Sequence, residues 1–296
     1  MFSSRLKSRF EVLPVSIHPL AAVSPRAKIG TNVQIGPFCV VESDVAIGTG
    51  CVLESHAVIR NGTTLGDNNH VFEGVILGGF PQHVQMPENP GRLIIGSANT
   101  IRENSTIHRA MESDNVTVIG DGNLLMVNVH IAHDCQIGSN TIITNNTMLA
   151  GHVAVDDRAY LSGAVAVHQF CRIGTLAMVG GQAHMGKDIP PYVTVDGLSS
   201  MAVGLNQIGL RRAGYDRDAI AQLKAAYRVL YRSGLTWGET LKRLKQEFPD
   251  GPAVSLYEFC SKTRRGIVPE RRLPPGATIK LKQEPQGDQK LRAKAG

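Results

Sequence analysis

The chain has 296 residues, of which 42% are hydrophobic, 19% charged and only 5% aromatic, and it carries a formal net charge of +6 at pH 7. It contains no run of 18 apolar residues, so the sequence predicts no transmembrane segment. Seven basic and three acidic residues fall within residues 269–296, which leaves the rest of the chain nearly neutral and argues against nucleic acid as a partner.

The N-terminal segment carries three basic residues, Arg5, Lys7 and Arg9, but lacks the apolar stretch that a secretory signal needs. We therefore predict a short leader over residues 1–16. The regular part of the sequence begins at Ile17.

From Ile17 to Val179 an aliphatic residue recurs every six positions. Ile, Leu or Val occupies 25 of the 28 positions in this register, far above the 42% hydrophobic content of the chain. A period of six fits neither a helix nor a long strand, but it fits short strands joined by tight corners. Three such repeats, one for each side of a triangle, would complete one coil. We predict an all-β parallel β-helix over residues 17–193.

The register fails at His83, Asn89 and Ser113. The first two failures lie in residues 79–91, which contain three prolines and cannot continue the coil. The third predicts a shorter excursion over residues 110–114. Loops on a rigid scaffold are where binding residues concentrate, so both excursions are candidate parts of a site.

The coil also contains a group of four histidines: His130, His133, His152 and His168. Residues three repeats apart stack in neighbouring coils, which places His133, Gly151 and Gln169 in one column. Imidazole titrates near neutral pH and can act as a general base. Three histidines can also hold zinc with an open fourth position. The residues alone leave both kinds of site open.

Four of the five cysteines occupy the small position two residues before the aliphatic residue: Cys39, Cys51, Cys135 and Cys171. This position faces inward, so we interpret these cysteines as core residues. The sequence has no CxxC motif, and the pattern favours a reducing compartment and a cytoplasmic location.

After Pro190 and Pro191 the six-residue pattern ends. Apolar residues at helical spacing then predict helices over residues 216–233, 237–248 and 254–259. We predict a small α-helical C-terminal domain over residues 194–268. Residues 269–296 are predicted to form a disordered basic tail.

Several motifs resemble those of a known family. Residues 128–135 (NVHIAHDC), 149–153 (LAGHV) and 166–170 (AVHQF) closely resemble the acyl-carrier-protein-dependent UDP-N-acetylglucosamine O-acyltransferases of lipid A synthesis, a hexapeptide-repeat family. So do residues 106–109 (TIHR), 188–193 (DIPPYV), 209–212 (GLRR) and 231–234 (YRSG). The resemblance covers nearly all of residues 17–267.

This resemblance implies a left-handed coil and a homotrimer with its sites between subunits. It also implies that a (3-hydroxy)acyl group is transferred from acyl carrier protein to the 3-hydroxyl of UDP-N-acetylglucosamine, the first step of lipid A biosynthesis. The family uses neither a metal nor a cofactor beyond the carrier-protein thioester. These properties are expectations from the resemblance.

The resemblance further assigns roles to individual residues. His133 would be the general base, Asp134 would fix its tautomer, and the Gly151 N–H would stabilise the oxyanion. Gly181 matches the position that limits acyl length, and its lack of a side chain predicts a long acyl chain. The implied substrate-binding residues are His108, His130, His152, His168, Gln169, Gly181, Asn206 and Arg212.

The loop at residues 81–86 departs from the family pattern. The family usually reads PQDLKY there, and this chain reads PQHVQM, so Gln82 is retained while His83 and Gln85 replace an acid and a base. In the family these two positions contact the acceptor. A changed acceptor sugar is therefore our hypothesis for this chain.

Other classes of protein also use this coil. A zinc-dependent carbonic anhydrase of the γ type would use the same histidines as metal ligands, and a non-catalytic scaffold would use none of them. A later N-acyltransferase of the same pathway carries an additional N-terminal uridine-binding domain, for which a coil beginning at Ile17 leaves no room. Bound zinc would favour the carbonic anhydrase hypothesis.

Overall fold

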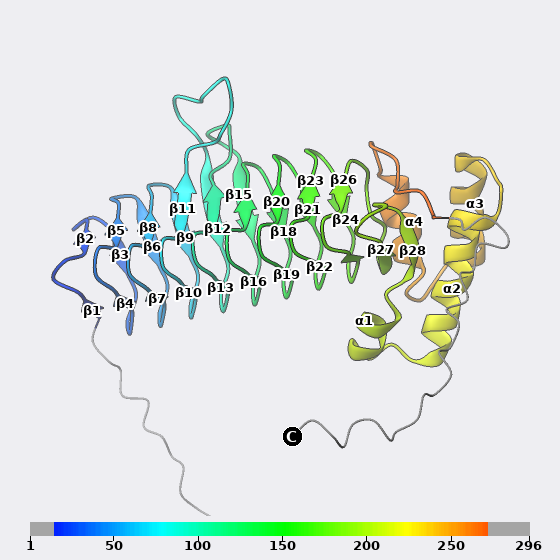
Figure 1. Cartoon of the computed structure of the whole chain (residues 1–296), viewed down its shortest axis with the longest axis horizontal. Coiled ribbons are helices and arrows are strands. Elements are labelled where there is room, and N and C mark those ends of the chain that lie inside the picture. The colour runs from blue at the N-terminus through cyan, green and yellow to red at the C-terminus, as the bar shows by residue number, and fades with distance from the viewer. Residues whose placement is uncertain (1–14, 272–296) are drawn as a thin grey trace, which may run out of the picture.

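The structure is a computed structural model that describes residues 15–271. It shows an elongated, prism-shaped left-handed parallel β-helix with a group of helices at its C-terminal end (Figure 1). Three sheets of 11, 9 and 8 strands form the faces of the prism, and strands three repeats apart pair in parallel along most of it. The predicted fold class is confirmed.

The first sheet contains β1 (Ser16–Ile17), β4 (Gln34–Ile35), β7 (Val52–Leu53), β10 (His70–Val71), β13 (Thr100–Ile101), β16 (Leu124–Leu125), β19 (Ile142–Ile143), β22 (Tyr160–Leu161), β25 (Met178–Val179), β27 (Val193–Val195) and β28 (Ala202–Leu205). The second contains β2 (Ala22–Val23), β5 (Val40–Val41), β8 (Val58–Ile59), β11 (Ile76–Gly79), β14 (Thr106–His108), β17 (His130–Ile131), β20 (Met148–Leu149), β23 (Ala166–Val167) and β26 (His184–Met185). The third contains β3 (Lys28–Ile29), β6 (Val45–Ile47), β9 (Thr63–Leu65), β12 (Arg92–Ile95), β15 (Val116–Ile119), β18 (Gln136–Ile137), β21 (Ala154–Val155) and β24 (Arg172–Ile173).

The recurring aliphatic residue is the last residue of most of these strands and points into the prism, as Ile131 and Leu149 do with no exposed surface. The four cysteines at the small inward position are buried and unpaired, which confirms that they are core residues. Each inward aliphatic side chain contributes about 1.5–3 kcal/mol through burial.

The corners turn through a residue in the left-handed region of the Ramachandran plot, and this residue also recurs every six positions. Asn128, Asn140 and Asn146 have φ between 57° and 60°, as asparagine tolerates this conformation. Asp134 and His152 adopt φ of 60° at the same corner position. Non-glycine residues adopt this conformation at an energetic cost, which the packed strands on either side overcome.

Both interruptions of the repeat leave the prism at the corner between the second and third sheets. The first joins β11 to β12 through residues 80–91, and Figure 1 shows it projecting from the coil. The second joins β14 to β15 through residues 109–115. The sequence predicted both excursions at these places.

A ladder of buried amides runs inside the corner between the third and first sheets. Asn99 donates from its backbone and side-chain nitrogens to Asn69 Oδ1, at 2.9 and 3.0 Å. The Asn123 N–H in turn donates to Asn99 Oδ1 at 2.9 Å. All three residues are at most 1% exposed, so water cannot replace these partners.

We expect Asn99→Ala to lower the free energy of unfolding by about 2–4 kcal/mol, because the Asn123 N–H would lose its acceptor while remaining buried. Urea denaturation monitored by circular dichroism measures this change. The matched control is Asn145→Ala at an exposed corner position, which should change stability by less than about 0.5 kcal/mol. Equal losses in the two variants would contradict a role for the ladder.

The C-terminal helices are α1 (Gln207–Arg212), α2 (Arg217–Arg232), α3 (Trp237–Glu247) and α4 (Val254–Ser261). The last three are the predicted helices, and α2 and α3 begin after the capping residues Asp216 and Thr236. In the described part of the chain, no helix is long and apolar enough to cross a membrane.

The predicted boundaries need two corrections. Strands β27 and β28 form an antiparallel pair that extends the first sheet past residue 193, so the helical part begins only at Gln207. The tail was predicted to be disordered from residue 269, but Glu270 forms an ion pair with Arg232 at 2.6 Å, and the Arg271 N–H donates to Ala202. These contacts order residues 269–271. The predictions for residues 1–14 and 272–296 fall outside the described residues.

Candidate active site

Of the histidines predicted to cluster, His133, His152 and His168 lie on the corner between the second and third sheets, from which both excursions also leave. His130 lies instead on strand β17 of the second sheet. His133 and Asp134 follow β17, and Gly151 and His152 follow β20 one coil later. The backbone of the two coils is joined by a hydrogen bond from the His152 N–H to the His133 carbonyl at 3.0 Å. The column predicted from the repeat spacing is present.

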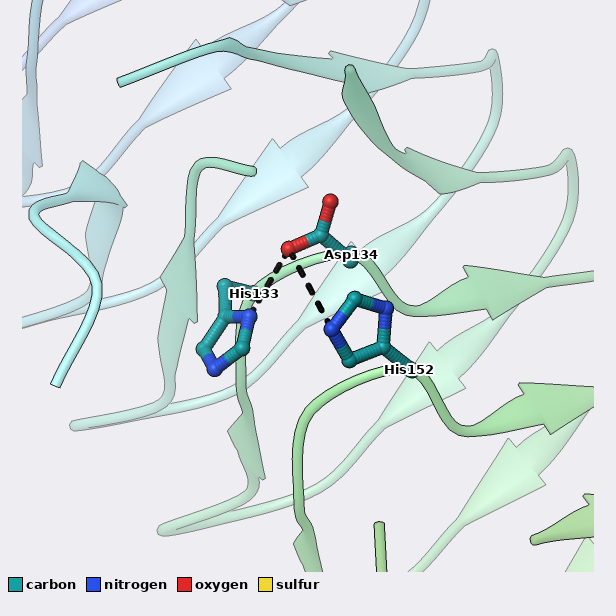
Figure 2. Close-up of side chains that lie close together, drawn as sticks. All are labelled: His133, Asp134 and His152. Atoms are coloured by element: carbon teal, nitrogen blue, oxygen red, sulfur yellow. Dashed lines mark hydrogen bonds and ion pairs between the residues drawn. The ribbon is translucent and has the colours of Figure 1, made fainter. Parts of the chain in front are cut away.

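His133 and Asp134 form a hydrogen-bonded pair (Figure 2). Nδ1 of His133 lies 2.8 Å from Oδ2 of Asp134. A carboxylate can only accept, so Nδ1 carries the proton and Nε2 keeps its lone pair. The side chains are 12% and 6% exposed, so this pair is shielded from most solvent. The arrangement leaves Nε2 of His133 able to accept a proton.

The Asp134 carboxylate is held by the shorter excursion. The Met111 N–H donates to Asp134 Oδ2 at 3.0 Å, and the Asn115 side chain donates to Oδ1 at 3.2 Å. The Asp134 N–H donates to Thr117 Oγ1 at 2.8 Å. Sequence reasoning missed Met111 and Asn115 because an irregular excursion gives no periodic signal, and it missed Thr117 because a residue of a regular strand does not stand out from the repeat.

Gly151 lies directly beneath the His133 ring. A Cβ atom on Gly151 would lie 2.5 Å from Cε1 and 2.7 Å from Nε2 of His133, closer than a carbon contact allows. Among residues 15–271, no acceptor receives a hydrogen bond from the Gly151 N–H. This position therefore combines room for the imidazole with an available backbone donor.

His152 faces the same carboxylate from the next coil. Its Nε2 lies 3.9 Å from Asp134 Oδ2, and its ring stands at 90° to the His133 ring with the centroids 5.3 Å apart. Burial lowers the pKa of His152, and the Asp134 charge opposes this shift. The Phe170 ring stacks on the His152 ring, with the centroids 4.6 Å apart. Phe170 was not predicted, although it lies one coil after His152 in the same column.

His108 and His130 form a second pair towards the N-terminal side. Their ring centroids are 4.9 Å apart, and Thr106 Oγ1 lies 2.8 Å from His130 Nδ1. Burial lowers the pKa of both imidazoles, and the nearby His130 and His133 lower the pKa of His108 further, to about 4. Both side chains are therefore neutral at physiological pH.

The lowered pKa of His108 predicts a loss of stability in acid. Folding disfavours the protonated form of His108. The stability that this residue gives to the folded state is therefore complete above the unfolded pKa of 6.5, and it is lost as the pH falls through about 4. The full contribution is about 3 kcal/mol. Urea unfolding between pH 7 and 4.5 should show wild type losing more stability than His108→Gln. Parallel curves for the two proteins would contradict this assignment.

The long loop brings His83 to the same corner. Its ring stands edge-on to the His133 ring, with the centroids 6.1 Å apart. The Gln85 N–H donates to His83 Nδ1 at 3.1 Å. Gln82 and Gln85 are exposed, and among residues 15–271 no hydrogen bond joins their side chains to His133, Asp134 or Gly151. Of the three loop residues predicted to bind the acceptor, His83 is the one that lies against the proposed base.

The other predicted residues are distributed along the prism. His168 and Gln169 continue the column one coil further and are exposed, with His168 Nδ1 3.1 Å from the Gln169 carbonyl. Gly181 lies on a different corner, beside Gly163 and Gly197. Asn206 and Arg212 lie on another face, so a single chain does not bring them together with His133.

Asn206 and Arg212 line a groove of about 650 Å³ between α1 and the first sheet. Tyr160 and Met178 contribute to its floor, and Ile208 to its wall. Asn206 also caps α1, because its side chain accepts from the Gly209 N–H at 2.9 Å. The groove is large enough for a nucleotide-sized ligand.

Three potential metal ligands meet at the corner. The ligand atoms of His133, Asp134 and His152 lie within 4.8 Å of one another. This set has two histidines and one carboxylate, which is a composition that catalytic zinc sites use. The carbonic anhydrase hypothesis would therefore draw on the same three residues as the general-base hypothesis.

Comparison with known proteins gives consistent matches along the chain. A family model described as UDP N-acetylglucosamine O-acyltransferase, domain 2, matches residues 188–268, and the bacterial transferase hexapeptide model matches residues 26–61 and 117–151. An acyl-[acyl-carrier-protein]–UDP-N-acetylglucosamine O-acyltransferase from Paraburkholderia phymatum is 47% identical over 258 residues, which cover 85% of this chain and 98% of the relative. The enzyme of the same name from Thiobacillus denitrificans is 48% identical over 255 residues, or 86% and 99% of the two chains.

Solved structures agree with these matches. The UDP-N-acetylglucosamine acyltransferase of Francisella novicida has a TM-score of 0.84 and 38% identity, covering 86% of this chain and 95% of its own. The UDP-N-acetylglucosamine O-acyltransferase of Moraxella catarrhalis has a TM-score of 0.81 and 39% identity, covering 85% and 99%. Because the similarity extends over nearly the full length of these relatives, the chain belongs to the family of acyl-[acyl-carrier-protein]–UDP-N-acetylglucosamine O-acyltransferases.

Proposed function

We propose that this chain transfers a (3-hydroxy)acyl group from acyl carrier protein to the 3-hydroxyl of UDP-N-acetylglucosamine, as the first step of lipid A biosynthesis. The observation that carries the proposal is the oriented pair of His133 and Asp134, with the Gly151 N–H beside it, in a member of this family. With five unpaired cysteines, we place the enzyme in the cytoplasm.

In the proposed reaction, Nε2 of His133 accepts the proton of the sugar 3-hydroxyl. The sugar oxygen forms a bond to the thioester carbonyl carbon, whose oxygen becomes negatively charged. The Gly151 N–H stabilises this oxygen, because a preorganised donor needs no reorganisation when charge develops. The carbon–sulfur bond then breaks, and the proton on His133 passes to the leaving thiolate, which becomes the carrier-protein thiol. The residues present need no further cofactor for these steps.

Asp134 has two tasks in this scheme. It fixes the tautomer of His133, and its charge stabilises the imidazolium that forms during the reaction. The hydrogen bonds from Met111 and Asn115 keep its carboxylate in place while the charge on His133 changes. The histidines His108, His130, His152 and His168, with Gln169, would position the sugar and the acyl chain.

A homotrimer would complete the site. Asn206 and Arg212 lie on a different face of the prism from His133, so a neighbouring subunit must present its groove for all of them to contact one substrate. A guanidinium such as that of Arg212 suits the diphosphate of the nucleotide. The mass of the assembly in solution, measured by light scattering, tests this part of the proposal.

An acyl-transfer assay with a series of acyl carrier protein thioesters tests the proposed function. We expect long acyl chains to be preferred, because Gly181, at the position that limits acyl length in the family, adds no side chain there. A preparation that transfers no acyl group from any thioester, and that contains one equivalent of zinc by elemental analysis, would instead support the carbonic anhydrase alternative.

A changed acceptor is the second candidate, and the position of His83 favours it. His83 lies against the proposed base, where an acidic residue is usual, so the groups that meet the acceptor differ in charge. Rates with UDP-N-acetylglucosamine and with its 3-amino analogue measure this selectivity. A ratio equal to that of a relative with the usual loop would reject the hypothesis.

A further inference from the structure

Loop 80–91 is tied to the coil at both of its ends. The Arg109 N–H donates to the Gly79 carbonyl at 3.0 Å, and the Gly91 N–H donates to the Ala110 carbonyl at 2.9 Å. These bonds fix where the loop leaves and returns. They do not by themselves fix the direction in which its tip points, because the hydrogen bonds recorded beyond the two ends stay within the loop.

One side-chain contact near the base of the loop can fix that direction. The Phe80 ring is the first side chain of the loop, and the Arg109 guanidinium carbon lies 5.0 Å from its centroid. Phe80 is 44% exposed, so the ring has no deep apolar pocket of its own. The Arg109 guanidinium is therefore a principal contact of the Phe80 ring.

Arg109 is an unusual cation because it is buried without an acidic partner in the described part of the chain. It is 9% exposed, and among residues 15–271 no carboxylate lies within ion-pair distance of it. Glu42 and Asp44, whose charges act on Arg109, form ion pairs with Arg60 and Arg92 instead. Burying an unpaired charge is costly, so the face of the neighbouring Phe80 ring is a favourable alternative partner.

The Arg109 side chain packs closely against Gly62. A Cβ atom on Gly62 would lie 2.7 Å from Arg109 Nη1 and 3.1 Å from its Cδ, so the Arg109 side chain fills the space that glycine leaves open. Gly62 has φ of +79°, a conformation that other residues adopt only with strain. Arg109 therefore provides a fixed platform at the base of the loop.

We propose that Arg109 and Phe80 form a positioning pair that directs the loop so that His83 lies beside His133. Neither residue touches the reacting atoms, so both act through the loop. That His83 faces the sugar acceptor rests on the proposed function, whereas the effect of the pair on the loop does not. The pair thus sets the affinity for the acceptor rather than the rate of the chemical step.

Two substitutions of Phe80 test the ring. Phe80→Leu removes the aromatic face and should raise the KM for UDP-N-acetylglucosamine about tenfold, with kcat within about twofold of wild type. Phe80→Tyr keeps the face and should restore the wild-type KM. Amide hydrogen exchange of residues 82–86, followed by mass spectrometry, should become faster in Phe80→Leu and stay unchanged in Phe80→Tyr.

The chain offers a matched control. Arg102 lies over the Phe72 ring at 4.5 Å, on the corner between the first and second sheets. Arg102 also pairs with Glu103, but Phe72→Leu likewise removes an arginine–ring contact, so it should change neither the KM nor the exchange of residues 82–86. Arg109→Lys keeps the charge but loses the planar group, so it should resemble Phe80→Leu.

The proposal is overturned if the amides of residues 82–86 exchange at equal rates in Phe80→Leu and Phe80→Tyr. It is also overturned if Phe80→Leu changes kcat and leaves the KM unaltered. Hydrogen exchange needs no substrate. A protein that did not accept UDP-N-acetylglucosamine would reject the proposed function, while the exchange measurement would still decide whether Phe80 and Arg109 position the loop.

Discussion

Replacing His133 by alanine should lower acyl transfer at least about 100-fold, the contribution usual for a general base. In wild type, Asp134 accepts from Nδ1 at 2.8 Å and leaves Nε2 free to take the proton of the attacking hydroxyl. Alanine removes this acceptor, and the other histidines of the corner do not occupy its position. The measurement is the initial rate with a saturating carrier-protein thioester.

The control for this variant is His184→Ala. His184 is exposed on β26, and its side chain takes no part in the site, so we expect a rate within about twofold of wild type. His133→Ala should retain its circular dichroism spectrum and its state of assembly, because His133 is not a core residue. Activity within tenfold of wild type would reject His133 as the base.

Gly151→Ala should be almost as damaging, although it adds one methyl group. That group would lie 2.5 Å from Cε1 of the His133 ring, so the ring must move away from the position that Asp134 and the substrate require. A displacement of about 1 Å at a reacting group can cost on the order of 100-fold in rate. The backbone N–H remains in this variant, so the loss would report on the imidazole and not on the oxyanion.

Gly163→Ala is the matched control at another corner. Its Cβ would lie 3.5 Å from the Asn145 carbonyl oxygen and 3.7 Å from Thr144 Oγ1, which are ordinary contacts. We expect a kcat within about twofold of wild type for Gly163→Ala and similar thermal stability for both variants. A Gly151→Ala enzyme as active as Gly163→Ala would show that the His133 ring is free to shift without consequence.

The sequence by itself determined the coil and the column of site residues. In a parallel β-helix each strand pairs with the strand one coil further on, so sequence spacing becomes spatial position with few alternatives. For this reason His133, Gly151 and the corner that carries them could be located by counting. The same regularity predicted both excursions, because a break in the repeat must leave the coil.

Boundaries and loop contacts were less predictable. Helix α1 is six residues long and was missed, since so short a segment gives no periodic signal. The sheet extends past residue 193 because β27 pairs in parallel with β25 and leaves an open edge, to which β28 adds in the antiparallel direction whatever the repeat does. Glu270 is held by contacts with residues far away in sequence, such as Arg232, which lies 38 residues away.

Only the tertiary structure determined which contacts the site residues make. Three sets of contacts join irregular segments to regular ones. They are the hydrogen bonds from Met111 and Asn115 to Asp134, the contact of His83 with His133, and the contact of the Phe80 ring with Arg109. Their geometry follows from packing between residues far apart in sequence, which no repeat encodes. The repeat therefore determines the positions of the histidines along the coil, and long-range packing determines what each of them contacts.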